Sequence, residues 1–424
     1  MNKLLKKLFP ICRSITGAGL KKSIDLILSS YPKNIIKNSK ILKLKTGLKA
    51  YGWTIPKEWA IKDAYLKKKN KYIIDFKKNN LHVINYSYPV KLINCDFDNI
   101  KKYLFYDLKK KNSIPYITSY YKKKIGLCLS YNNFKKLKKG KYDLVINTHF
   151  KKGFSYLMET IVKGKKKEEV FFSTYLCHPS MANNELSGPI IMSEICKWIQ
   201  SKKKNRYTYR FVVGPETIGA IFYIKKNLNI LRKRVNYAFN LTCQGGGKEF
   251  SFLPSKNKNT QTDKICLNIL KFHYGTFKQY SFQERGSDER QYCGPHINLP
   301  MVSVMKKKYH EYKEYHTSKD NLKFLKINDL KHTLEFYKKA IFIIENNYRC
   351  LSRYPCEPFL ESHFKFYKQG GLKFSGKMKL YLDILIYCDG KKTILDICEI
   401  LNISFLKNLK YFKNLRKRNL IKFI

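Results

Sequence analysis

The segment 177–189, CHPSMANNELSGP, combines side chains that could bind a metal ion or a polar substrate. His178 follows the apolar run 170–176, which is typical of a buried strand. Asn184 and Glu185 come next, in a polar loop that leads into a helical pattern. Histidine and carboxylate side chains are common zinc ligands in enzymes. A histidine at a strand end, followed by amide and carboxylate groups at a helix start, therefore predicts a metal or substrate site.

Four later segments place further polar side chains at strand ends or in loops, where ligands bind in open α/β sheets. Glu216 follows the predicted strand 209–213, and Thr242 follows the predicted strand 236–241. The last two segments contain the remaining candidates, which are Arg285, Asp288, Glu289 and Arg290, then Tyr315, His316 and Asp320. Each of these residues alone is more often a helix cap or a hydrogen-bonded loop residue than a functional group, and Asp320 could cap the helix expected from residue 327.

The elements that must position these residues alternate between strand and helix from about residue 125. This alternation predicts an α/β fold with a largely parallel sheet that helices cover on both faces. The expected strands are 142–147, 170–176, 209–213, 236–241 and 300–304, and the expected helices are 188–200, 218–228, 263–274 and 327–346.

Three flanking regions have different patterns. Residues 4–42 have helical apolar spacing, whereas residues 45–121 contain short strand-like runs between proline and asparagine residues. Residues 378–424 contain three helical patterns and an apolar end, which fit a small domain of helix-turn-helix or winged-helix shape. The strand-like runs are 72–76, 81–86 and 116–120.

The charge of the chain is its most unusual bulk property. Its 424 residues include 85 Lys and Arg against 31 Asp and Glu, a formal net charge of +54. Such a charge is typical of proteins that bind nucleic acid or an anionic surface. The lysines are spread along the chain with many Asn, Ile and Tyr, as drift in an AT-rich genome would produce, and not gathered in one stripe or tail. We therefore interpret the charge as a result of compositional drift and not as evidence of a dedicated anion-binding surface.

The sequence also bears on the compartment. No run approaches the roughly 18 apolar residues that a membrane span needs, and Lys6 and Lys7 interrupt the centre of any signal peptide. The 12 cysteines form no CxxC pair, and several lie in apolar runs, as reduced core cysteines do. These features predict a soluble, cytoplasmic protein with no membrane partner.

The order of the five polar segments resembles that of the zinc aminopeptidases with two co-catalytic metals, whose fold is an α/β/α sandwich. That family carries H-x-D, D-x-x-S-G, E-E-x-G, N-L-D-M and a late Y-H-T…D. This chain has His178, then NELSG at 184–188, ETIG at 216–219, NLTC at 240–243 and YHTSKD at 315–320.

A closer resemblance is to the aminopeptidase-like proteins described as polysaccharide biosynthesis-associated. It is carried by the strings FPICRSITG, YGWTIPKEW, CHPSMANNELSGP, PETIG, GSDERQY and EYHTSKDNL. The resemblance implies a three-layer α/β/α aminopeptidase-like domain of residues 1–44 and 125–348. It also implies an inserted β-rich domain at 45–124 and a C-terminal winged-helix domain at 349–424.

Departures from the zinc aminopeptidase pattern limit the metal site. Ser180 stands where that family has the Asp that orients the ligand histidine. Neutral side chains also replace three carboxylate ligands, at Asn184, Thr217 and Thr242. The residues left to bind metal are His178, Glu216 and His316, which are enough for one catalytic zinc with an open position for water. They are too few for a two-metal site.

The resemblance implies a hydrolase that cleaves an amide bond in a small peptide or an amino-sugar-related substrate with a zinc-activated water. Glu216 is the general base if Gly219 sets the register, and a metal ligand if Pro215-Glu216 is matched to the Glu-Glu pair. Glu185, Asp288 or Glu289 would then supply the other role, and Asp288 is the second catalytic candidate. The candidate substrate-binding residues are Asn184, Glu185, Arg285, Arg290 and Tyr315, with the arginines able to clamp a carboxylate or phosphate.

Two other function classes stay open. The loss of metal-binding carboxylates would also suit a non-catalytic scaffold that keeps the fold and binds a small amide or sugar. A nucleic-acid-binding regulator could use the basic helix expected at 405–418, but a solvated, lysine-rich face has the same composition. We rank DNA binding below a protein-interaction or structural role for this region, and a homo-oligomer is left open.

Overall fold

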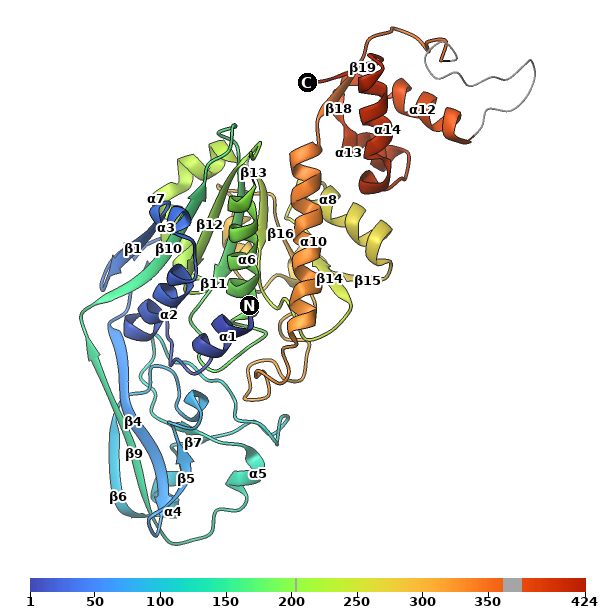
Figure 1. Cartoon of the computed structure of the whole chain (residues 1–424). Helices are drawn as coiled ribbons and strands as arrows, with labels where there is room; N and C mark the ends of the chain where they lie inside the picture. The colour runs from blue at the N-terminus through green and yellow to red at the C-terminus, as the bar shows by residue number, and fades with distance from the viewer. Residues whose placement is uncertain (203, 361–375) are drawn as a thin grey trace. The chain divides into compact units, whose positions relative to one another are not determined.

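The computed structural model describes residues 1–202, 204–360 and 376–424 (Figure 1). By their internal contacts these residues form two compact units, 1–258 with 278–334 and 259–277 with 335–424. The division into an α/β domain, an insertion at 45–124 and a domain at 349–424 remains a prediction. Residues 361–375 of the last expected domain lie outside the described residues.

Eight strands of the described chain form one mixed sheet; seven belong to the first unit, and the eighth, β15, begins at the last residue of the 259–277 segment. The pairs β11–β12, β11–β13 and β13–β16 are parallel, whereas β1–β10, β10–β12 and β14–β16 are antiparallel. The predicted α/β fold is confirmed, with a parallel centre and antiparallel margins. In sheet order the strands are β1 (Ser39–Lys45), β10 (Phe154–Val162), β12 (Thr208–Gly214), β11 (Glu169–Tyr175), β13 (Val235–Asn240), β16 (Met301–Met305), β14 (Phe250–Leu253) and β15 (Phe277–Gln279).

The centre of the sheet is buried on both faces. Every residue of β11 is buried, and Phe172 stacks between Phe211 and Phe239 of the neighbouring strands at 5.3 and 5.0 Å. Helices α6 (Ser187–Ser201) and α7 (Ile218–Arg234) connect β11 to β12 and β12 to β13. Because these connections run in opposite directions across the sheet, right-handed crossovers place the two helices on opposite faces. The strand order therefore reverses at β11.

A second, four-stranded sheet extends from the first. Its order is β5-β4-β9-β6, and β9 leads directly into β10 of the large sheet (Figure 1). The strands are β4 (Glu58–Lys68), β5 (Lys71–Asp75), β6 (Val90–Asp96) and β9 (Lys141–Lys151). The same region holds the short strands β2 (Lys49–Ala50), β3 (Trp53–Thr54), β7 (Leu104–Phe105) and β8 (Leu127–Cys128), and the short helices α4 (Phe97–Lys101) and α5 (Tyr131–Phe134).

Two of the predicted strands in this region are wrong. Residues 81–86 begin in a 3₁₀ turn (Asn80–His82), because the Asn79 side chain accepts the Leu81 N–H. Residues 116–120 make only isolated bridges, and the Tyr116 N–H donates to the carbonyl of His316 at 2.9 Å. This segment is therefore held by a distant loop and not by a sheet.

The predicted helical stretch 4–42 is also broken. It contains α1 (Asn2–Leu8), α2 (Gly17–Ser29) and α3 (Lys33–Lys37), and it ends in strand β1. Pro10 and Pro32 stand at the breaks, since proline disrupts a helix interior but is accepted at its start.

The second unit contains α8 (Gln261–Ile269), the following π-helical turn (Leu270–Tyr274), and most of the C-terminal region. The long helix α10 (Ile327–Asn346) begins in the first unit and ends in the second. Three predicted helices are present, as α12 (Gly376–Ile386), α13 (Ile394–Ile400) and α14 (Phe405–Lys417). The apolar end forms strand β19 (Ile421–Phe423), which joins β17 (Arg349–Ser352) and β18 (Asp389–Thr393) in the order β18-β17-β19. That the C-terminal region is a winged-helix domain remains a prediction.

Among the described residues, no helix combines the length and apolar character that a membrane crossing requires.

A buried ion cluster ties together three neighbouring strands of the large sheet. Arg210 on β12 bonds Glu169 on β11 at 2.5 Å and Glu159 on β10 at 2.8 Å, and all three side chains are at most 4% exposed. The Tyr223 hydroxyl of α7 also donates to Glu159. The two carboxylates are therefore neutralised mainly by one guanidinium.

Replacing Arg210 with Met should lower the free energy of unfolding by about 3–5 kcal/mol, because two buried carboxylates lose their main partner. Urea denaturation measures this loss. Lys40→Met is the matched control, since Lys40 is an exposed partner of the same Glu159 and should matter by about 0–1 kcal/mol. Equal effects of the two substitutions would contradict this interpretation of the cluster.

Candidate functional site

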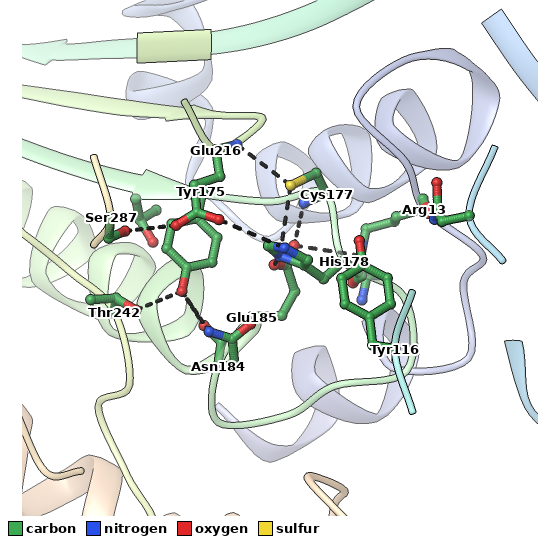
Figure 2. A network of polar contacts seen from close by, with 12 residues as sticks. Arg13, Tyr116, Tyr175, Cys177, His178, Asn184, Glu185, Glu216, Thr242 and Ser287 are labelled. Carbon is green, nitrogen blue, oxygen red and sulfur yellow. Dashed lines mark hydrogen bonds and ion pairs between the residues drawn. The ribbon is translucent and has the colours of Figure 1, made fainter. Parts of the chain in front are cut away.

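The carboxyl ends of three adjacent parallel strands bring the predicted site residues together. His178 follows β11, Glu216 follows β12 and Thr242 follows β13, and these strands are neighbours in the sheet. The strand order reverses at β11, and ligands of open α/β sheets bind where this happens. Figure 2 shows the resulting cluster of polar side chains.

His178 is the centre of this cluster, with its two ring nitrogens facing different carboxylates. Its Nδ1 lies 2.5 Å from Oε2 of Glu185, within hydrogen-bond distance. Its Nε2 lies 3.7 Å from Oε2 of Glu216, too far for a hydrogen bond (Figure 2). Because Glu185 occupies Nδ1, Nε2 is the nitrogen left to act as a ligand. Although burial lowers it, the neighbouring Cys177 and Glu185 raise the pKa of His178 well above its usual range, so a metal ion would displace a proton from Nε2.

Glu216 sits at a strained turn. The Ile218 N–H donates to the Glu216 carbonyl at 2.7 Å across Thr217, whose φ is +64° and ψ is −69°. This is the rare γ-turn, which costs on the order of 1–3 kcal/mol and persists only when neighbours enforce it. Here Asp288 accepts the Thr217 N–H, and Arg290 donates to the Thr217 hydroxyl, both at 2.6 Å. The two contacts hold the turn that presents Glu216.

The electrostatics of the two catalytic candidates differ. Burial raises the pKa of Glu216, although His178 and the Ser287 hydroxyl, which donates to Oε1 at 2.9 Å, lower it. Burial and the charge of Glu216 raise the pKa of Asp288 well above its usual range. Both carboxyl groups therefore keep a proton to a higher pH than an exposed carboxyl does.

His316 approaches the cluster from the other side. Its ring lies 5.3 Å from that of His178 and stacks on Tyr315 at 3.9 Å, and its buried Nε2 has no hydrogen-bond partner. Burial and the nearby His178 and His310 lower the pKa of His316 well below its usual range. The imidazole is therefore neutral, which is the form that binds metal.

Tyr116 lines one side of the site, a role that the sequence did not indicate. Its ring meets those of His178 and His316 edge-on, at 5.0 and 5.2 Å. The segment around it also bonds the loop after His316, since the Ile114 N–H donates to the Ser318 hydroxyl at 3.0 Å. An aromatic ring from the region between β7 and β8 thus stands beside both candidate histidine ligands.

Asn184 and Thr242 hydrogen-bond to a common partner. The Asn184 amide donates to the Tyr175 hydroxyl at 2.8 Å, and that hydroxyl lies 2.6 Å from the Thr242 hydroxyl (Figure 2). The Asn184 Oδ1 is buried and has no hydrogen-bond partner. Two positions expected to carry metal-binding carboxylates therefore hold neutral groups bonded through Tyr175.

Asp320 does not cap the helix that begins at Ile327. Its carboxylate instead accepts the backbone N–H groups of Asn183 and Asn184, at 2.6 and 2.9 Å, and the Tyr312 hydroxyl. Burial raises its pKa to about 6, against these hydrogen bonds. Asp320 fixes the loop between His178 and α6.

The substrate-binding candidates lie in different surroundings. Arg290 is exposed and reaches the turn at Thr217, whereas Tyr315 is buried against His316. Arg285 is not brought to the cluster: its guanidinium packs over the Phe282 ring at 5.0 Å and donates to the Phe282 carbonyl. Glu289 is also fixed in place, because Tyr309, Asn240 and two backbone N–H groups donate to its carboxylate.

The donor types of His178, Glu216 and His316 suit a zinc ion, but the three ligand atoms do not all lie within 4.8 Å of one another, so His316 would have to move toward the other two to share one ion. Ligands held at about 2.0–2.1 Å in a tetrahedron lie more than 3 Å apart, comparable with the 3.7 Å between His178 and Glu216. The partnerless Nε2 of His316 is a second feature that a ligand bond would explain.

A different group, Cys177, His178 and Glu185, has ligand atoms within 4.8 Å of one another. It fits a metal ion less well. Both Glu185 oxygens are already used, by His178 and by the Cys177 N–H. Burial raises the pKa of the Cys177 thiol to about 11, which disfavours the thiolate that binds metal.

Comparisons with known proteins agree on the family. A family model described as a domain of unknown function, DUF4910, matches residues 2–347. A protein of Clostridium acetobutylicum is 37% identical over 425 residues, covering 99% of this chain and 95% of its own length. Its provisional name is that of a polysaccharide biosynthesis protein with an aminopeptidase-like domain.

Solved structures agree on the fold. A crystal structure from Clostridium acetobutylicum, provisionally described as a peptidase, has a TM-score of 0.90 at 36% identity and covers 100% of this chain and 95% of its own. A zinc aminopeptidase from Bacillus subtilis has a TM-score of 0.56 at 14% identity, covering 81% and 93%. A peptidase M28 precursor from Shewanella amazonensis has a TM-score of 0.55 at 11% identity, and the match covers 84% of this chain and 94% of its own. The fold is therefore aminopeptidase-like, as the sequence predicted.

Proposed function

The chain belongs to the family described as the domain of unknown function DUF4910, and from this premise we propose that it is a zinc-dependent, aminopeptidase-like hydrolase. One observation carries the proposal: Nε2 of His178 faces Glu216 at 3.7 Å, and the ring of His316, whose buried Nε2 has no hydrogen-bond partner, lies 5.3 Å from the ring of His178. The names of the structural neighbours, two peptidases and a zinc aminopeptidase, support it. The bond cleaved is an amide.

His178 and His316 would hold the metal through their Nε2 atoms, with Glu216 as third ligand or as base. A bound zinc ion supplies a Lewis acid for the scissile carbonyl and lowers the pKa of its bound water to about 7. Tyr116 and Tyr315 pack against the two histidines and shield them from bulk water.

Glu216 is placed to handle the proton of the attacking water. Its Oε1 is fixed by Ser287, so Oε2 is the oxygen that faces His178. A raised pKa suits a general base, which works best when its pKa is near the operating pH. Asp288 accepts the Thr217 N–H at 2.6 Å, so support of the turn suits it better than removal of the water proton.

The substrate is a small peptide or an amino-sugar-related amide. The relative's name, which refers to polysaccharide biosynthesis, supports the second of these. Arg290 is the exposed cation at the Glu216 turn and is the residue we assign to a carboxylate or phosphate of the substrate. Arg285, which packs on its own turn, is no longer assigned such a role.

A second candidate function is favoured by one specific observation. Asn184 and Thr242, which stand where carboxylate ligands would be, each hydrogen-bond the Tyr175 hydroxyl. These two positions therefore offer no negative charge to a second metal. A scaffold that binds an amide or sugar without cleaving it would tolerate this change. Measured hydrolysis of an amide substrate would favour the hydrolase over the non-catalytic scaffold.

Zinc content tests the ligand assignment. The purified chain, saturated with zinc and freed of unbound metal, should retain about one ion per chain, and His178→Ala or His316→Ala should lose it because each removes one of three ligands. Elemental analysis gives the stoichiometry. His149→Ala is the matched control, since His149 is exposed on β9. A wild-type chain without zinc contradicts the proposed function, and a fully loaded His178→Ala variant contradicts the ligand set.

Glu216→Gln separates the two roles of Glu216. If Glu216 is the base, kcat on aminoacyl or N-acetyl amides should fall about 10²–10⁴-fold with zinc retained, because the proton acceptor is lost. If it is a ligand, zinc content should fall together with kcat. Glu335→Gln, at an exposed ion pair on α10, is the control. Unchanged turnover in Glu216→Gln would exclude both roles, and a zinc-loaded wild type with no turnover on any amide would favour the scaffold.

A further inference from the structure

Glu185 lies behind the candidate ligand His178 and not in front of it. We infer that Glu185 is a positioning residue that holds a proton on Nδ1 of His178 and so leaves Nε2, which faces Glu216, as the nitrogen that would bind a metal. This inference rests on the proposed function, because a free Nε2 matters most if it binds a metal. It replaces the substrate-binding role that the sequence suggested for Glu185.

The contact between the two side chains is short and fully buried. Oε2 of Glu185 lies 2.5 Å from Nδ1 of His178, and Glu185 is 0% exposed (Figure 2). A carboxylate has no proton to give in its ionised form, so the shared proton comes from the imidazole. In the neutral imidazole, the ring nitrogen without a proton is then Nε2.

The other Glu185 oxygen fixes the orientation of the carboxylate. Oε1 accepts the backbone N–H of Cys177, the residue before His178. Because that N–H is part of the main chain, it can only donate. The carboxylate is therefore held by one fixed donor and faces the imidazole with its second oxygen.

Arg13 supplies the opposite charge. Its Nε lies 4.0 Å from Oε1 of Glu185 and donates to the carbonyl of His178 at 3.3 Å, and both charged side chains are 0% exposed. Its Nη1 donates to the Leu8 carbonyl at 2.6 Å. A buried guanidinium therefore lies beside the carboxylate that holds His178.

Ser180 does not compete for this role. It stands at the position where zinc aminopeptidases have an orienting aspartate, but its hydroxyl accepts a hydrogen bond from Asn80 at 3.0 Å. The orienting carboxylate thus comes from the loop before α6, five residues further along the chain.

A glutamine at position 185 should reverse the arrangement. The Cys177 N–H requires an oxygen acceptor, so the amide oxygen must face Cys177 and the NH₂ group must face Nδ1 of His178. The imidazole then has to accept at Nδ1 and carry its proton on Nε2, where it blocks a metal bond. The substitution keeps the size of the side chain and changes only whether Nδ1 of His178 donates to residue 185 or accepts from it.

The test uses nitrogen NMR on the full metal-free chain labelled at histidine, at about pH 8, with the His178 signals assigned from a His178→Asn variant. The wild type should have a proton on Nδ1 of His178, and Glu185→Gln should have a bare Nδ1 and a proton on Nε2. Zinc affinity, measured by competition with a chelator, should fall about 10–100-fold in Glu185→Gln. Glu194→Gln, at a partly exposed ion pair on α6, should change neither measurement.

The wild-type spectrum decides the inference even if Glu185→Gln fails to fold, because a bare Nδ1 on His178 in the wild type would overturn it. A Glu185→Gln variant that keeps both the Nδ1 proton and full zinc affinity would overturn it as well. Failure of the proposed function has a different signature, since a wild type that binds no zinc leaves the Nδ1 measurement intact.

Discussion

The buried contact between His178 and Glu185 is the interaction on which the candidate site depends. It links the end of β11, the loop before α6 and, through Arg13, the N-terminal segment between α1 and α2. A charged pair this deep is costly to desolvate unless its remaining atoms are also bonded. Here backbone groups of Cys177, His178 and Leu8 provide most of those bonds, while Nη2 of Arg13 is buried without a hydrogen-bond partner in the described chain. The contact with Glu185 fixes Nδ1 of His178 and leaves Nε2 facing Glu216.

The remaining parts of the site are held by similar means. Asp320 fixes the loop before α6 through backbone N–H groups, and Asp288 fixes the strained turn at Thr217. His316 also has a positive φ, of +54°, and its carbonyl accepts the Tyr116 N–H. Buried carboxylates and positive-φ residues are expensive in a folded protein and gather where function requires a fixed geometry. Asp288, Asp320, Thr217 and His316 place several such features near the carboxyl ends of the parallel strands, which supports the proposal that the active site lies there.

Much of this arrangement could be predicted from local patterns. The apolar strands and helices after residue 125 predict the α/β fold, and the resemblance of the motif order to that of zinc aminopeptidases implies His178, Glu216 and His316 as candidate ligands. Long-range partners could not be predicted in this way. Arg13 lies 165 residues before His178, and nothing in FPICRSITG alone indicates that its guanidinium is buried beside a histidine. Residues 116–120 have a strand-like composition, but hydrogen bonds to the distant loop at 316–318 decide their structure.

The location of a bound metal tests the central claim most directly. Crystals grown with zinc and measured on both sides of the zinc absorption edge should contain one anomalous peak at about 2.0–2.1 Å from Nε2 of His178 and from Nε2 of His316. A peak between Cys177 and Glu185, or no peak in a crystal that diffracts well enough to show one, would contradict the account.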